Sequence, residues 1–201
     1  MRITADRISV GTGVAAALPP VSLEFASAEP AMLAVDTADR PTVLALAVSG
    51  RMRLGGGQVY VDGRIEPDRL RRVTAIVDAP TVAEPADTVS TRHIVHEELV
   101  ISGQRANRAA VERLIGLASA DDFADEPLGA LPGDLRIRLL AETAASRPGV
   151  RALILTSPER HGGDPVELSR LIADLSDRGF AVLTLTSAAM VTAVGGTGTL
   201  Q

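Results

Sequence analysis

Two continuous apolar runs joined by an amphipathic helix constrain the fold of this chain more than any other part of the sequence. The runs are Ala152–Leu155 and Ala181–Thr186, and neither alternates regularly between polar and apolar residues. A strand without such alternation is expected to be buried on both faces, as in a parallel sheet covered by helices. Between the runs, Pro165–Arg178 places its leucine and isoleucine residues at helical spacing, and Gly179 ends the helix. This β-α-β unit predicts an α/β fold with a parallel sheet.

Shorter apolar runs before this unit predict further strands, because they are rich in β-branched residues and bounded by Gly, Pro or Asp. They fall at Val21–Phe25, Met32–Val35, Gln58–Val61 and Val73–Val77. Helical patterns predict helices over Pro41–Gly50, Arg105–Leu117 and Leu135–Ser146. The expected order is therefore a β-rich N-terminal part, a helical middle near 85–130 and the β-α-β unit. We expect Gly55–Gly57 to form a turn, since Gly adopts positive φ at little cost.

Charge and composition exclude several classes of function. The net charge is −5, and all 20 basic residues are Arg. This acidic balance argues against nucleic acid or an anionic membrane surface as a partner. Cysteine is absent, which excludes disulfides and thiolate metal sites. No apolar run reaches the length of a membrane span, and the N-terminal residues do not form a signal peptide. We therefore expect a cytoplasmic protein that meets a membrane only through a partner.

Taken in order, these segments resemble the ATP-binding domain of ABC transporters, the ABC ATPase family. Val21–Phe25 (VSLEF) resembles the strand before the phosphate-binding loop, and Gln58–Gly63 (QVYVDG) resembles the family's SGEVYVDG. Leu131–Leu135 (LPGDL) stands where the LSGGQ signature begins a helix. Leu153–Pro158 (LILTSP) stands at the Walker B strand, and Gly179–Ser187 stands at the H-loop strand.

The resemblance extends along nearly the whole chain and depends on the order and spacing of these segments. It implies a single ABC ATPase-like domain over residues 1–201, with a P-loop NTPase-like α/β fold. In this fold an N-terminal β-rich subdomain adjoins a mixed central sheet flanked by helices. The small helical subdomain of the family would lie at about 85–130.

The phosphate-binding loop implied by the resemblance lacks the residues that bind phosphate in the family. It comprises Val35, Asp36, Thr37, Ala38, Asp39, Arg40, Pro41 and Thr42. The family pattern needs two glycines so that backbone N–H groups can wrap phosphates, and a Lys to reach them. Here Val35 and Arg40 replace the glycines, and Pro41 replaces the Lys and removes a backbone donor. Thr42 remains at the Mg²⁺-ligating position, but Asp36 and Asp39 would repel a phosphate beside Arg40. We expect this eroded loop to close, because Val35 and Pro41 are stiff where glycine is required.

The other motif positions of the family have changed as well. Thr156 replaces the Walker B carboxylate and Ser157 the catalytic glutamate, and neither can act as a metal carboxylate or general base. Asp78 stands at the Q-loop glutamine, and Ser187 stands at the switch histidine. The signature positions hold Leu131, Pro132, Gly133, Asp134 and Leu135, and no aromatic residue lies in Ile8–Gly13, where the family stacks adenine. We therefore expect no cofactor and no metal, with weak binding of ATP and Mg²⁺ as the alternative.

Two further groups of residues have competing interpretations. His93, His96, Glu97 and Glu98 are spaced to share a helix face, but a zinc site needs a third protein ligand, so we favour a solvated helix. Ser157, His161 and Asp164 are the residue types of a hydrolase triad, but no nucleophile-elbow pattern surrounds the Ser. We favour an eroded Walker B to D-loop segment, in which Asp164 corresponds to the D-loop aspartate.

The leading functional hypothesis is a non-catalytic ABC ATPase-like subunit. It would act through its surfaces as a structural or regulatory partner of a membrane permease or another ATPase, or as a homodimer. In the family, domains pair head to tail, so the changed phosphate loop and the changed signature would disable both shared ATP sites. The helical middle and the loop at Asp78–Pro80 are the expected contact regions, since the family meets its transmembrane domains there. Two alternatives are a subunit that binds nucleotide weakly through Arg40 and Thr42 and an unrelated α/β enzyme that uses the eroded cleft.

Overall fold

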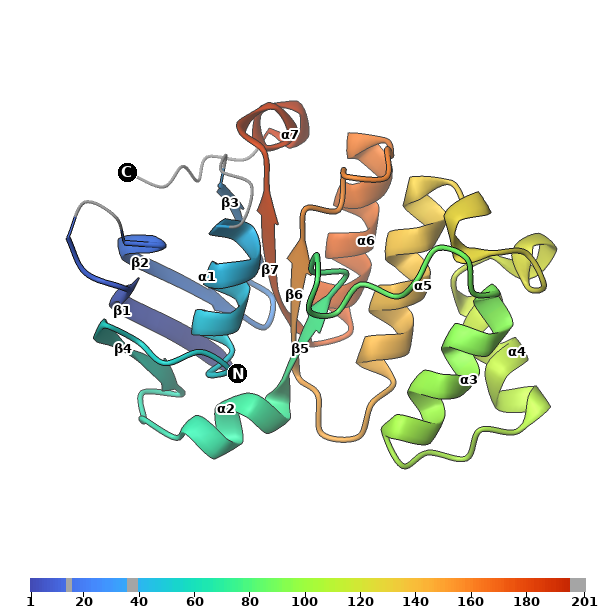
Figure 1. Cartoon of the computed structure of the whole chain (residues 1–201), viewed down its shortest axis with the longest axis horizontal. Coiled ribbons are helices and arrows are strands. Elements are labelled where there is room, and N and C mark those ends of the chain that lie inside the picture. Colours follow the sequence, from blue (N-terminus) through green and yellow to red (C-terminus); the bar gives the residue numbers. More distant parts are fainter. Residues whose placement is uncertain (14–15, 36–39, 196–201) are drawn as a thin grey trace.

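The computed structural model describes residues 1–13, 16–35 and 40–195, which form two sheets with helices packed against them (Figure 1). An antiparallel sheet has the strand order β2-β1-β4, and a parallel sheet has the order β3-β7-β6-β5. The strands are β1 (Arg2–Val10), β2 (Leu18–Ala26), β3 (Ala31–Ala34), β4 (Gly56–Val61), β5 (Thr74–Val77), β6 (Ala152–Thr156) and β7 (Ala181–Thr186). The helices are α1 (Arg40–Val48), α2 (Pro67–Val73), α3 (Thr91–Ile101), α4 (Arg108–Leu117), α5 (Gly133–Ala145), α6 (Pro165–Asp177) and α7 (Ala188–Val194).

The parallel sheet confirms the predicted α/β fold. Strands β6 and β7 run parallel with Ile154 beside Leu183, and every residue of both strands is buried. Alternate residues of β6 face opposite sides: Leu153 joins the core beneath α5 and α6, and Ile154 joins the core beneath α1. Both faces of the sheet are therefore covered, which explains the continuous apolar runs.

Helix α1 lies between the two sheets and packs against both (Figure 1). Its Leu44 and Val48 are fully buried and share one core with Ile3 and Phe25 of the antiparallel sheet and Leu183 of the parallel sheet. This shared core fixes the N-terminal sheet against the β-α-β unit.

Helices α3 and α4 lie on the far side of α5 from the sheet (Figure 1). They pack through Leu99 and Leu114, which are in one continuous core with Leu139 of α5. Two short 3₁₀ helices, η2 (Asp121–Phe123) and η3 (Leu128–Ala130), connect α4 back to α5. The division into one domain with a helical subdomain stays a prediction. Within the described residues, no helix is both long and apolar enough to cross a membrane.

Two local predictions were wrong. Val73, expected in a strand, is the last residue of α2, which spans most of the Arg-rich stretch Arg64–Arg72. Pro67 opens this helix, and Arg71 and Arg72 in its last turn complement the helix dipole. The second error concerns Gly55–Gly57, because Gly56 and Gly57 begin strand β4 instead of forming a turn.

Gly57 allows β4 to approach an irregular stretch of β1. It adopts φ +76, and a Cβ there would overlap the backbone carbonyl of Arg7. The register of β1 and β4 shifts between Asp6 and Ser9, as at a β-bulge. The glycine is therefore required both by its φ and by the close approach of the two backbones.

We expect Gly57→Ala to destabilise the protein more than a matched change at Gly63. Gly63 has φ +78, but a Cβ added to it would meet no other atom within 4 Å, so Gly63→Ala tests the cost of positive φ alone, about 1 kcal/mol. Gly57→Ala adds a backbone overlap and should cost about 2 kcal/mol more. Urea unfolding of the two variants measures the difference, and equal losses would contradict the close approach.

Candidate functional site

The motif positions predicted from the sequence meet at one edge of the parallel sheet. Val35, Asp78, Ser157 and Ser187 each follow the carboxyl end of one of its four strands. In open α/β sheets this edge is where ligands bind.

The phosphate-binding loop is described only at its two ends. Asp36, Thr37, Ala38 and Asp39 lie outside the described residues, so the expected closure of the loop stays a prediction. Val35 is buried, and its N–H donates to the carbonyl of Thr186 at 2.8 Å. Arg40 and Pro41 begin α1, and Thr42 is buried in its first turn.

The Walker B position presents hydroxyls in place of carboxylates. Thr156 is fully buried, and its hydroxyl has no hydrogen-bond partner among the residues that the structure describes. Ser157 adopts φ 47, and its N–H donates to the carbonyl of Leu185 at 2.7 Å. Hydroxyl side chains at these two positions lack the charge that binds Mg²⁺ and the basicity that activates water.

Glu159 is a carboxylate near the switch position that the sequence analysis did not identify. One oxygen accepts from the hydroxyl of Thr186 at 2.7 Å, and the other accepts from the backbone N–H of Ser187 at 2.8 Å. The Ser187 side chain caps α7 by accepting from the N–H of Met190. Glu159 thus holds the loop after β6 against the end of β7.

Asp78 is a buried carboxylate at the end of β5. Its side chain is 2 % exposed, and its backbone adopts φ 54. Arg136 of α5 is 1 % exposed and donates through Nη2 to Oδ1 at 3.1 Å and through Nε to Oδ2 at 3.2 Å. Such two-point pairing is what allows a charge to be buried at all, because each ion alone would be costly to desolvate.

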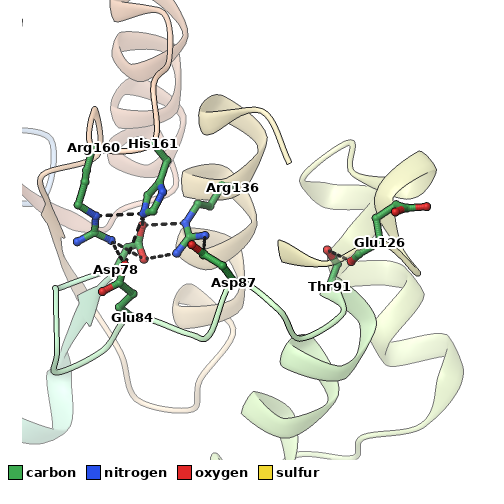
Figure 2. Close-up of polar contacts among 8 residues, drawn as sticks. All are labelled: Asp78, Glu84, Asp87, Thr91, Glu126, Arg136, Arg160 and His161. Carbon is green, nitrogen blue, oxygen red and sulfur yellow. Dashed lines mark hydrogen bonds and ion pairs between the residues drawn. The ribbon is translucent and has the colours of Figure 1, made fainter. Parts of the chain in front are cut away.

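Four more charged or polar side chains extend this pair into a network, which we call the Asp78 cluster (Figure 2). Arg136 also donates to Asp87, and Arg160 approaches Asp78 at 3.2 Å and Glu84 at 3.0 Å. Arg160 Nε donates to His161 Nε2 at 3.0 Å. The cluster comprises Asp78, Glu84, Asp87, Arg136, Arg160 and His161. It joins the end of β5, the loop after it, α5 and the loop after β6.

The network changes the protonation equilibria of two of its members. The hydrogen bond from Arg136 lowers the pKa of Asp87 below its usual value, although partial burial opposes this shift. Burial acts to lower the pKa of Arg136, but hydrogen bonds to Asp78 and Asp87 outweigh it and raise that pKa. Both effects keep Asp87 and Arg136 ionised at neutral pH.

The loop after β6 contacts the segment at the predicted signature position. Leu131 is buried, Pro132 precedes α5, and Gly133 is its first residue. A Cβ at Gly133 would overlap the carbonyl of Gly162. Asp134 Oδ1 accepts from the N–H of Asp164 at 2.7 Å, and Leu135 packs against the core. The segments predicted to stand at the signature and at the D-loop therefore contact each other.

The two other groups singled out in the sequence are not assembled into sites. His93 and His96 are exposed on α3, and among the described residues the group of possible metal ligands is a different one, Asp78, Glu84 and His161. Ser157, His161 and Asp164 have separate partners. His161 belongs to the Asp78 cluster, whereas Asp164 caps α6 by accepting from the N–H of Val166 at 2.7 Å.

The sequence matches no protein-family model and no curated protein. Solved structures do match. The ATP-binding subunit of an ABC transporter aligns with a TM-score of 0.65 and 14 % identity over 95 % of this chain and 82 % of that one. The dimeric structure of a bacterial ABC transporter cassette aligns with a TM-score of 0.70 and 15 % identity over 94 % of this chain and 89 % of that one. At these identities the likeness concerns the fold, and this chain has the fold of an ABC ATPase.

We expect Arg136→Met to be strongly destabilising, because it removes the two-point partner of a buried carboxylate. Loss of one member of a buried ion pair costs about 3–5 kcal/mol. The matched control is Arg170→Met, which breaks the exposed pair of Arg170 with Glu167 and should cost less than about 1 kcal/mol. Denaturant unfolding distinguishes the two, and a loss at Arg136 as small as that of the control would contradict our description of the cluster.

Proposed function

We propose that this chain is a non-catalytic ABC ATPase-like subunit, acting as a structural or regulatory partner of a membrane permease or of another ATPase. The observation that carries the proposal is the Asp78 cluster. At the sheet edge where an ATPase would hold nucleotide, the Q-loop position is a buried carboxylate already neutralised by Arg136 and Arg160. Side chains at this edge therefore serve contacts within the chain.

The other strand ends support the same proposal. The Walker B position holds Thr156, whose hydroxyl is buried. Glu159 already accepts hydrogen bonds from Thr186 and Ser187. The chain also contains no Lys, so no residue of that type is available to reach phosphate from anywhere in the sequence. Each change weakens a different step of phosphoryl transfer, so one substitution would not restore the activity.

A groove of about 480 Å³ between the loop after β5, α3 and α5 is the surface through which we expect this subunit to act. Its lining includes Val82, which is 49 % exposed, and Ile101, which is 71 % exposed. Glu84, Glu97 and Glu98 also line it. Exposed apolar side chains that line a groove with polar residues around them are typical of an interaction site.

The lining of the groove indicates the chemistry of its occupant. Arg147 on its wall is paired with Glu98, and Arg51 donates to Thr74 and to backbone carbonyls. Glu97 is exposed, and no ion pair to it is found within the described residues. A short amphipathic helix with an apolar face and flanking basic residues would match the groove in shape and charge. The two solved structures with this fold belong to an ABC transporter subunit and a transporter cassette, so we assign the occupant to a transporter permease or a second ATPase subunit.

If the proposal is correct, MgATP will not bind. Titration calorimetry with MgATP should give no heat of binding, and the Tm should not change. A ligand present at about 100 times its Kd stabilises a protein by about 2.7 kcal/mol, so a bound nucleotide would be visible in both measurements. Binding in the micromolar range would contradict the proposal and favour a nucleotide-binding subunit.

Charge introduced into the groove should disrupt the complex with a partner. We expect Val82→Glu and Ile101→Glu to abolish co-purification with the permease encoded nearest to this chain. Val166→Glu is the matched control, because Val166 is 53 % exposed on α6 and does not line the groove. A complex that survives both groove variants, or one that is lost equally with the control, would place the interface elsewhere.

A further inference from the structure

We propose that Asp78, Glu84 and His161 bind a divalent transition-metal ion, which takes the place that the Arg160 guanidinium occupies in this structure. The three residues come from the end of β5, the loop after it and the loop after β6 (Figure 2). Neither the fold nor the proposed role as a partner subunit requires such an ion.

The spacing of the three possible ligand atoms suits a small dication. They all lie within 4.8 Å of one another. His161 Nε2 is 3.8 Å from Asp78 Oδ2 and 3.7 Å from Glu84 Oε1. Ligand atoms around tetrahedral zinc, with bonds of about 2.0–2.1 Å, are about 3.4 Å apart. His161 would therefore have to approach each carboxylate by only a few tenths of an ångström.

Arg160 already places a cation among these three side chains. Its Nη2 lies 3.2 Å from Asp78 Oδ1 and 3.0 Å from Glu84 Oε1, and its Nε donates to His161 Nε2 at 3.0 Å. A guanidinium has no acceptor atom, so Nε2 must accept this hydrogen bond with a free lone pair. The same Nε2 atom is the one that would bind a metal ion.

The guanidinium is nevertheless an imperfect occupant. Within the described part of the chain, Nη1 of Arg160 is buried without a hydrogen-bond partner, which is unfavourable for a charged donor, whereas Nη2 has its two carboxylate contacts. The Arg160 side chain is 24 % exposed, and its loop continues into Gly162 and Gly163. The exchange requires this partly exposed side chain to leave the cluster for solvent.

The charge of the cluster favours this exchange. Its three carboxylates face two guanidiniums, so the acidic side chains outnumber the arginines by one. Replacing the Arg160 guanidinium with a dication removes that excess. Asp78, which is buried, keeps a cation beside it before and after the exchange, and the entering ion has to lose part of its hydration shell.

The surroundings of the three ligands resemble the outer shell of a metal site. Arg136 holds both oxygens of Asp78, and Asp87 in turn holds Arg136, which fixes the carboxylate in one orientation. Asp78 and Glu84 line the groove described above, which gives an ion a path to the site. Two carboxylates and one imidazole suit Zn²⁺ or Mn²⁺, and three protein ligands leave a position open for water.

Titration of Zn²⁺ into the untagged protein by calorimetry tests this proposal. We expect the wild-type chain to bind one zinc ion at this site. Arg160→Gln replaces the guanidinium with a shorter, uncharged amide and so removes the competing charge, and it should tighten binding by at least about tenfold. His161→Gln should abolish binding in both backgrounds, and Glu84→Gln should weaken it. If His161→Gln fails to fold by circular dichroism, the partly exposed Glu84 provides the ligand variant instead.

The matched control uses the other two histidines of the chain, which has three in total and no cysteine. His93→Asn combined with His96→Asn should leave the zinc affinity unchanged, because both side chains lie on α3 away from the cluster. Absence of binding by the wild-type chain, no tightening in Arg160→Gln, or undiminished binding in His161→Gln would overturn the proposal and make Arg160 a permanent counter-ion. Loss of binding only in the α3 double variant would also overturn it.

Discussion

The buried ion pair of Asp78 and Arg136 is the interaction on which the arrangement of this fold depends. A carboxylate that is 2 % exposed at the end of a sheet strand is tolerated only with a cation held against it, and α5 supplies that cation. The position of α5 is thereby coupled to the sheet by charge as well as by apolar packing. Because α3 and α4 share their core with α5, the same ion pair helps to position the helical part of the chain.

The loops at the carboxyl edge of the parallel sheet are bonded to one another. Parallel strands bring their carboxyl ends together, so that the loops after them can surround a ligand. In this chain the loop after β6 contacts three neighbours: Glu159 binds the end of β7, Arg160 approaches Asp78, and Asp164 binds the start of α5. The fold is that of an ABC ATPase, but these side chains hold the edge together through contacts within the chain, which agrees with a role that depends on shape and surfaces.

The sequence predicted the parallel sheet well, because burial on both faces leaves an apolar run that local inspection can find. It did not predict β1, since its buried residues Ile3, Ala5 and Ile8 change spacing where the register shifts around Arg7. It identified Asp78 as a motif position but not its partners. Arg136 is 58 residues further along the chain, and local patterns do not indicate which distant guanidinium will meet a buried carboxylate. Glu159 was missed for the same reason, as its partners are 27 and 28 residues away.

The fully buried Thr156 has an evolutionary consequence. An aspartate at this position would have no exposed surface, and the guanidiniums of Arg136 and Arg160 are already shared among Asp78, Glu84 and Asp87. A new carboxylate would therefore be buried without a counter-charge until other residues changed with it. Thr156→Asp made alone would give a less stable protein, so a sequence with a carboxylate at this position must also carry a change that supplies a cation, and the two substitutions are coupled in evolution.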